Sequence, residues 1–537
     1  MRYLPLALAV TVLLSACQPD TRSPATSNMT TAASTLPASA LEEATVLDLQ
    51  RKMSAGTLTS HALVQAYLDR IAAIDSAGPH LNAVIERNPD ALKEADRLDG
   101  ERKAGKVRGP LHGIPVLLKD NIDAFPMVNS AGSLALANHH PKNDAYLVRK
   151  LRAAGAVILG KTNLSEWANF RSTHSSSGWS GRGGQTKNPY VLDRSPCGSS
   201  AGTGSAIAAN LATVGIGTET DGSIICPAAV AGLVGIKPTV GLISRDGIIP
   251  ISFSQDTAGP MTRSVADAAA LLTALDGPDT SDAASNERPT RAPIDYISHL
   301  NAEALKGARI GVVRKLMGFE PATDAVMEQA IAALKAAGAT VVDAQIPTLG
   351  QWDDAESEVL KYEFKPGLNT YLARNATPIH SLAELIAYNQ QHASTEMPHF
   401  AQELFEQSQA KGALNETAYI NARDKTRRLA GPEGIDAALK AQKLDALVAP
   451  AMTTAWPIDL AHGDKFIGAG YGPAAAARYP SLTVPMGQVH GLPVGIVFMG
   501  TAWSEPRLIE LGYAFEQATH ARKPPQFLPT VAQPARN

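Results

Sequence analysis

Apolar and polar positions follow two patterns along this chain. In the first part, apolar residues recur at helical spacing over 45–55, 60–75 and 88–104, and a Ser or Thr stands near the start of the first two segments. Further along, short apolar runs flanked by Gly, Pro or polar residues indicate strands. The chain therefore predicts a helical beginning followed by a layered body.

Strands and helices are expected to alternate through this body. The predicted strands are 113–118, 156–159, 212–217, 308–313, 340–343, 446–448, 481–484 and 494–499. The predicted helices are 145–154, 203–210, 265–275, 323–337 and 505–518. Such alternation predicts an α/β fold in which a mixed, mainly parallel sheet is covered by helices on both faces.

Composition favours a globular enzyme over a nucleic-acid binder. The chain has 537 residues, of which 45% are hydrophobic and 18% charged, and its formal net charge is −3. It can form a large core, and it lacks the basic excess that nucleic-acid binding requires. No HExxH, CxxC or clustered acidic loop occurs in the sequence, so we expect no metal and no other cofactor.

The N-terminus resembles that of a bacterial lipoprotein. Arg2 precedes the apolar stretch 4–14, which is too short to span a bilayer, and residues 14–17 read LSAC. This resemblance implies cleavage before Cys17, lipidation of its thiol, and a periplasmic protein anchored to a membrane. Gln18 favours the outer membrane. The alternative is an ordinary secretory signal cleaved elsewhere.

The predicted organisation has four parts along the chain. Residues 1–16 form the expected lipoprotein signal peptide, and 17–40 carry the lipidated cysteine and a flexible linker rich in Ser, Thr and Pro. A single domain is expected over 41–525, followed by a tail, 526–537. Within the domain, 351–434 is strongly helical and has few strand signals, which favours a helical insertion.

Three polar residues have patterns that point to chemistry: Lys119 in LLKDNID, Ser199 in CGSSAG and Ser223 in TETDGSI. No histidine stands in these segments, so a serine there can attack an amide only if the lysine takes its proton. A lysine with its ordinary pKa of about 10.4 is protonated at neutral pH. Because Lys119 ends the apolar run 114–118, we expect burial to lower its pKa, with one serine relaying the proton.

These segments resemble the amidase signature family of hydrolases, whose members have a Ser-Ser-Lys triad in a Gly/Ser-rich segment. The resemblance extends over about 41–525 and implies the fold of that family. It implies that Ser223 is the acylated nucleophile, Ser199 the relay serine and Lys119 the base. It also implies a cis peptide bond between Gly198 and Ser199.

The resemblance further implies an oxyanion site beside the nucleophile. Its donors would be the backbone N–H groups of Thr220, Asp221, Gly222 and Ser223. Ser200 would support the site by hydrogen bonding. The chain departs from the wider family twice, with Asp221 where most members have glycine and Ile225 where many have arginine. Asp221 either contacts a substrate amide or holds the loop, and the sequence leaves both open.

Within the family, the segments SPCGSSAG and GTETDGSI are similar to members that remove the C-terminal carboxamide of peptides. The resemblance therefore implies hydrolysis of a peptide amide to the free acid and ammonia, with internal peptide bonds spared. The insertion 351–434 would either shape the substrate entrance or form a solvated cap. We expect a monomer that contacts a peptide or small-molecule amide, no nucleic acid, and a membrane only through its lipid.

Two other functions stay open as alternatives. A broad amidase or esterase for small molecules would use the same triad. A non-catalytic binding lipoprotein is disfavoured, because it would not need a lysine buried beside two serines.

Two further motifs compete with the triad. The stretch 155–162 matches the phosphate-loop pattern GxxxxGK[ST], but its central residues predict a strand rather than an exposed loop. The stretch 198–202 matches the nucleophile elbow GxSxG, which would make Ser200 the nucleophile of a serine esterase. An elbow follows a buried strand, whereas a polar segment rich in Gly and Pro precedes this one. We therefore favour the triad.

Two cysteines flank the two serines. Cys197 stands two residues before Ser199, and Cys226 stands three residues after Ser223. An oxidising periplasm permits a disulfide between them. Two small buried thiols are the alternative, and the sequence leaves both open. A cysteine nucleophile is disfavoured because no histidine lies near either residue.

Overall fold

The computed structural model describes residues 41–290, 292–375 and 377–531. All of them belong to one compact unit. The predictions for the signal peptide, the lipidated Cys17 and the linker up to residue 40 lie outside the described residues, as does the second half of the predicted tail. No helix in the described ranges is long and apolar enough to cross a membrane.

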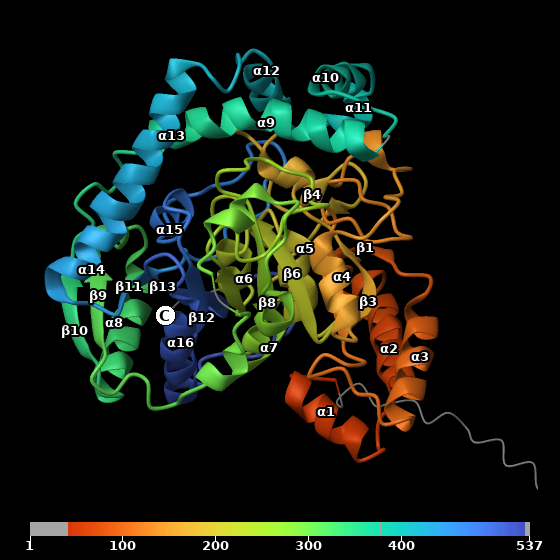
Figure 1. The fold of residues 1–537 in the computed structure, drawn as a ribbon, viewed down its shortest axis with the longest axis horizontal. Helices are drawn as coiled ribbons and strands as arrows, with labels where there is room; N and C mark the ends of the chain where they lie inside the picture. Colours follow the sequence, from red (N-terminus) through yellow and green to blue (C-terminus); the bar gives the residue numbers. More distant parts are fainter. Residues whose placement is uncertain (1–40, 291, 376, 532–537) are drawn as a thin grey trace, which may run out of the picture. The chain divides into compact units, whose positions relative to one another are not determined.

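An eleven-stranded sheet runs through this unit (Figure 1). In spatial order its strands are β1 (Val84–Arg87), β3 (Val157–Thr162), β2 (Pro115–Lys119), β6 (Val214–Glu219), β8 (Thr257–Thr262), β7 (Val234–Lys237), β12 (Ser481–Val489), β13 (Leu492–Met499), β11 (Ala446–Pro450), β9 (Arg309–Val313) and β10 (Thr340–Ala344). Two short strands, β4 (Trp179–Ser180) and β5 (Gly184–Gln185), pair separately. Each predicted strand coincides with a strand of the large sheet.

Parallel pairing in the large sheet is confined to two blocks. Strands β3, β2 and β6 pair in parallel toward one end, and β11, β9 and β10 do so at the other. The pairs from β6 through to β11 are antiparallel, as is β1 with β3. The predicted mixed sheet is confirmed, but the parallel part is interrupted in the middle. Strands β7 and β8 cause part of this interruption, and their short sequences, VGIK and TAGPMT, gave no strand signal.

Helices cover both faces of the sheet, as predicted. Leu482 of β12 lies against Gly512 of α16 on one face, whereas Thr483 points to the other face, where Ala229 of α6 lies beside Gly495. The helices outside the insertion are α1 (Val46–Ser54), α2 (Ser60–Arg70), α3 (Ala91–Lys103), α4 (Tyr146–Ala153), α5 (Ala201–Ala208), α6 (Ile225–Val230), α7 (Val265–Leu275), α8 (Pro321–Ala336), α14 (Ala437–Gln442), α15 (Gly472–Ala476) and α16 (Glu505–Thr519).

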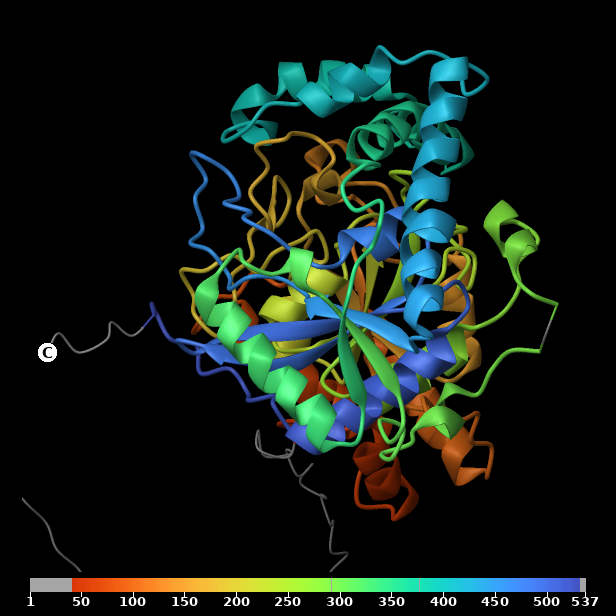
Figure 2. The same cartoon turned by 90° about the vertical axis from the view of Figure 1, so that its left-hand side faces the viewer.

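The segment 351–434 forms a helical layer at the top of the views in Figures 1 and 2. Its helices are α9 (Asp353–Asn375), α10 (Leu382–Gln391), α11 (Ala393–Glu396), α12 (Glu403–Gln409) and α13 (Thr417–Ala430). Buried polar contacts join α9 to the sheet domain below. Glu363 accepts hydrogen bonds from the Ser254 N–H at 2.9 Å and from the Ser252 hydroxyl, and the Tyr371 hydroxyl donates to Asp123 at 2.6 Å. This layer, which we call the cap, is therefore tied to loops near the end of β2.

Candidate active site

Lys119 ends β2 and is completely buried. Its Nζ lies 2.6 Å from Ser199 Oγ, 2.9 Å from Thr218 Oγ1 and 3.1 Å from the Thr218 carbonyl oxygen. Burial lowers the pKa of Lys119 to about 7, although the more distant Asp256 and Glu219 carboxylates act in the opposite direction. The amine can therefore be neutral near pH 7, as a general base requires.

Thr218 completes the surroundings of this amine, and sequence reasoning missed it. It stands near the carboxyl end of β6, which pairs in parallel with β2, so both strands end at the same edge of the sheet. Its Oγ1 also accepts a hydrogen bond from Asn121 Nδ2 at 3.0 Å. The position of Thr218 after the predicted strand 212–217 was the available signal.

Ser199 and Ser200 immediately precede α5, and the peptide bond between Gly198 and Ser199 is cis. Ser200 Oγ donates to the Thr218 carbonyl at 3.1 Å and accepts the Thr218 N–H at 3.2 Å. The Ser200 N–H donates to the Ser223 carbonyl at 3.2 Å. Ser200 therefore connects β6 with both serine segments. No strand precedes it within 186–200, so the context of a nucleophile elbow is absent there.

Ser223 lies in the turn between β6 and α6 and lines a cavity. Gly222 has a φ of +78°, and the ring of Tyr471 packs against it so closely that a side chain at this position would collide. Glu219 holds the turn from inside, because its Oε2 accepts the N–H groups of Ile224 at 2.7 Å and Ile225 at 2.9 Å. These contacts fix the backbone on both sides of Ser223.

The predicted oxyanion donors are free in three of four positions. Among the described residues, no group accepts a hydrogen bond from the N–H of Thr220, Asp221 or Ser223. The N–H of Gly222 faces the Glu219 carboxyl instead. The pKa of Glu219 is raised by burial, against the opposing effect of Lys237. The turn thus offers unpaired N–H groups beside a serine.

The structure brings Lys119 and Ser199 into direct contact and places Ser223 next to them through the Ser200 backbone. Within the described part of the chain, the hydroxyls of Ser199 and Ser223 make no hydrogen bond to each other. Catalytic contacts are often long before substrate binds, so this spacing is compatible with a relay between them.

A disulfide joins the two serine segments. Cys197 and Cys226 are bonded, with their Cα atoms 6.0 Å apart. The alternative of two free thiols is therefore wrong. The bond connects the residues just before Ser199 to those just after Ser223, so it stabilises the relative position of the two loops.

The phosphate-loop motif is a buried strand. Residues 156–162, which would have to cradle a phosphate, are all buried, and most of them form β3. Lys161 Nζ lies 3.1 Å from Asp120 Oδ1, and both side chains are fully buried. This ion pair occupies the lysine that a phosphate would need, which excludes the nucleotide interpretation, as expected.

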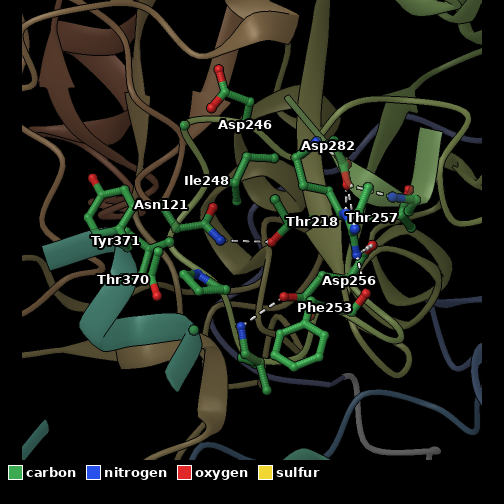
Figure 3. A pocket seen from close by; sticks show the side chains of 18 of the residues that line it. Asn121, Thr218, Asp246, Ile248, Phe253, Asp256, Thr257, Asp282, Thr370 and Tyr371 are labelled. Atoms are coloured by element: carbon green, nitrogen blue, oxygen red, sulfur yellow. Dashed lines mark hydrogen bonds and ion pairs between the residues drawn. The ribbon is translucent and has the colours of Figure 1, made fainter. Parts of the chain in front are cut away.

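Each of the two serines lines a cavity of its own. The smaller, of about 250 Å³, is bordered by Ser223 and Asp221, and the larger, of about 1180 Å³, is bordered by Ser199 and Thr218. Thr220 borders both. Figure 3 shows the larger cavity, with Asn121 beside Thr218, and with Thr370 and Tyr371 reaching it from α9. Substrate therefore has space on both sides of the two serines, between the sheet domain and the cap.

A serine that lines a cavity, a buried amine and free backbone N–H groups are what a serine-dependent hydrolase of amides needs. The mixed sheet with helices on both faces is the corresponding scaffold. The chain belongs to the amidase signature family: the family model described as Amidase matches residues 62–509. It is thus an amidase, and the predicted family, fold class and enzyme class are confirmed.

Known relatives cover nearly the whole chain. A probable amidase of Arabidopsis thaliana is 41% identical over 503 residues, which are 91% of this chain and 92% of the relative. A component of the glutamyl-tRNA(Gln) amidotransferase of Symbiobacterium thermophilum is 33% identical over 498 residues, 89% of this chain and 97% of the relative.

Solved structures of a peptide amidase are also similar. The peptide amidase PAM in complex with the competitive inhibitor chymostatin is 60% identical, with a TM-score of 0.90, and the match covers 91% of this chain and 100% of that one. The native peptide amidase from Stenotrophomonas maltophilia is 60% identical, with a TM-score of 0.87, over 90% of this chain and 99% of that one.

Proposed function

We propose that this amidase hydrolyses the C-terminal carboxamide of peptides, using Ser223 as nucleophile, Ser199 as relay and Lys119 as base. The observation that carries the proposal is the 2.6 Å contact between Lys119 Nζ and Ser199 Oγ inside a fully buried pocket. An ammonium group would have to be stabilised there by a carboxylate, and Lys119 has none within 4 Å among the described residues.

The hydrogen-bond partners of Lys119 match a neutral amine. In the neutral form, its two N–H groups would donate to the carbonyl and hydroxyl oxygens of Thr218, which leaves the lone pair to accept the proton of the Ser199 hydroxyl. Ser199 can therefore pass its proton to Lys119 while it takes the proton of Ser223. This transfer makes the Ser223 oxygen nucleophilic without a histidine.

The reaction would proceed through an acyl-enzyme. Ser223 Oγ attacks the amide carbon, and the free N–H groups of the nucleophile turn stabilise the oxyanion. The proton held by Lys119 returns through Ser199 to the leaving nitrogen, so the C–N bond breaks and ammonia departs. Water then attacks the ester with the same proton transfers and releases the free acid.

Two observations favour a peptide amide as the substrate. The solved structures that are 60% identical include a peptide amidase. The larger cavity, of about 1180 Å³, exceeds the range of about 300–1,000 Å³ that is usual for small-molecule sites. A broad amidase or esterase for small compounds remains the competing function, because it would need the same catalytic groups.

A substrate panel tests the proposal with the full-length protein. We expect release of ammonia from an amidated dipeptide, little turnover of the matching small aliphatic amide and ester, and no cleavage of the corresponding tripeptide acid. Equal or faster turnover of the aliphatic amide and ester would favour the broad enzyme. Release of an amino acid from the tripeptide without ammonia from the amide would contradict the proposal.

We also propose that the enzyme is lipid-anchored through Cys17 in the periplasm, most simply at the outer membrane. The sequence LSAC at 14–17 supports this, and Gln18 favours the outer membrane. Mass spectrometry of the mature N-terminus, after expression of the full-length chain in a bacterium, would detect acyl chains on Cys17. The Cys17→Ala variant should lose them and leave the detergent phase. An unacylated N-terminus elsewhere in the wild type would contradict the anchor.

A further inference from the structure

Asp221 differs from its neighbours in the nucleophile turn. Thr220, Gly222 and Ser223 are buried, whereas the side chain of Asp221 is exposed to the cavity that Ser223 lines. Its Oδ1 lies beside Gly472, and no described residue donates a hydrogen bond to its carboxyl. The carboxyl is therefore an available acceptor two residues before the nucleophile.

The other carboxyl on this cavity, that of Asp464, is already occupied. It accepts hydrogen bonds from the N–H of Ser177 at 3.0 Å, from the Ser177 hydroxyl at 2.6 Å and from Trp456 Nε1 at 3.1 Å. These bonds attach the loop around Asp464 to the sheet domain. Of the two carboxyls, only Asp221 has acceptor atoms left for a ligand.

The surroundings of Asp221 supply negative charge rather than a donor. Although the side chain is open to the cavity, the protein around it removes part of its solvation and raises its pKa, and the carboxylates of Glu219 and Asp353 add to this effect, while Lys237 opposes it. Glu356 of the cap also interacts with Asp221 unfavourably. A bound N–H group would relieve this unfavourable state, because a hydrogen bond to a charged group is among the stronger ones.

The remaining walls of the cavity suit the last residue of a peptide. They are largely apolar and aromatic, being formed by Phe170, Ile251, Leu360, Trp456, Phe466 and Tyr471. In an α-amino acid amide, the nitrogen is attached to the carbon next to the scissile carbonyl. This α-nitrogen is only two bonds from the carbonyl carbon that Ser223 attacks. The group that accepts a hydrogen bond from its N–H must therefore stand close to the nucleophile.

We propose that the Asp221 carboxyl accepts a hydrogen bond from the N–H group on the carbon next to the scissile carbonyl, and so selects amides of α-amino acids over simple aliphatic amides. This inference rests on the proposed function and adds the residue that recognises the substrate class. The bound N–H can belong to a peptide bond or to a free ammonium group.

Three substrates separate these cases in the full-length enzyme: an amidated dipeptide ending in phenylalanine, phenylalanine amide, and phenylpropanamide, which lacks the α-nitrogen. In Asp221→Leu, the ratio of kcat/KM for the dipeptide amide to that for phenylpropanamide should fall roughly 10- to 100-fold. The ratio of kcat/KM for phenylalanine amide to that for phenylpropanamide should fall as well. In Asp221→Asn, which keeps a carbonyl acceptor, the dipeptide ratio should be largely retained and the phenylalanine amide ratio lost.

A matched control and the contradicting results complete the test. Asp354→Asn removes an exposed charge of the cap that does not line the cavity and does not shift the pKa of Asp221, and it should leave the ratios unchanged. If all three rates fall together in Asp221→Leu, Asp221 only holds the loop and the inference is overturned. If Asp221→Leu does not fold, an unchanged phenylalanine amide ratio in Asp221→Asn overturns it instead. A wild-type enzyme that hydrolyses none of the three amides overturns the proposed function as well.

Discussion

Two lysines on neighbouring strands are both fully buried, but one lies beside a carboxylate and the other beside uncharged oxygen atoms. Lys119 ends β2 and Lys161 lies in β3, where it is paired in register with Leu118, and neither side chain is exposed to solvent. Lys161 forms an ion pair with Asp120 at 3.1 Å, whereas the polar contacts of Lys119 within the described ranges are to hydroxyl and carbonyl oxygens.

The difference bears on the proposed role of Lys119 as the base. The Asp120 carboxylate ties the amine of Lys161 into a buried ion pair, so Lys161 serves the structure. Without such a partner, burial disfavours the ammonium, which lowers the pKa of Lys119 to about 7. The proposed chemistry therefore depends as much on the absence of a carboxylate beside this amine, among the described residues, as on the lysine itself.

The largest expected effect comes from removing the proposed base or nucleophile. Lys119→Met and Ser223→Ala should each lower kcat/KM for an amidated dipeptide by about 10³-fold or more, because the nucleophile is lost or no longer activated. Steady-state kinetics measure the loss, and circular dichroism should show an unchanged fold. Either variant retaining more than a tenth of the activity would refute the triad.

Replacing Lys161 should lower the stability of the fold more than replacing Lys119, although Lys119 should matter more for activity. Lys161→Met leaves the buried Asp120 carboxylate without its nearest cation, so the free energy of unfolding should fall by about 3–5 kcal/mol. Lys119→Met removes a neutral amine, which should cost about 1 kcal/mol. Denaturant unfolding of the two full-length variants compares them directly.

The double variant Lys161→Met with Asp120→Asn serves as the control for this comparison. It removes both charges and should recover part of the lost stability. Equal destabilisation by the two single lysine variants would remove the proposed distinction between them.

The two serine segments near Lys119 are joined by a disulfide bond rather than by an ion pair. The bond between Cys197 and Cys226 closes a loop with a sequence separation of 29, so replacing both with serine should lower the free energy of unfolding by about 3 kcal/mol. Thermal unfolding with and without reductant measures this effect. Reductant should destabilise the native protein and leave the double variant unchanged, and a native protein insensitive to reductant at full reduction would contradict the role of the bond.

Much of the fold could be predicted from the sequence, because its strands are apolar and clearly bounded. The run 113–118 is a nearly continuous buried segment, and the helix 265–275 is a long, mostly apolar run that follows a capping Ser. The strand Thr257–Thr262 could not be predicted, because Gly and Pro interrupt it and only pairing with β6 and β7 defines it. Such pairing is a long-range property that local patterns do not contain.

The residues of the candidate site likewise fall into those that the sequence could predict and those that it could not. Lys119, Ser199 and Ser223 stand in motifs, so their proximity could be anticipated from a resemblance. Thr218 and Glu219 could not, because their contacts depend on the register between β2 and β6 and on the shape of one turn. The disulfide was undecided for the same reason, since only three-dimensional proximity distinguishes a bond from two thiols.

The most direct test of the account is the pH dependence of kcat/KM for an N-acetylated, amidated dipeptide, which does not titrate near neutral pH. Since the base must be neutral, kcat/KM should be constant above about pH 8 and fall tenfold per unit below the pKa of Lys119, about 7. Asp221 also has a pKa of about 7, so the same fall must persist in Asp221→Asn. A profile that stays flat to pH 5, or an acidic fall that disappears in Asp221→Asn, would contradict the assignment of Lys119 as the base.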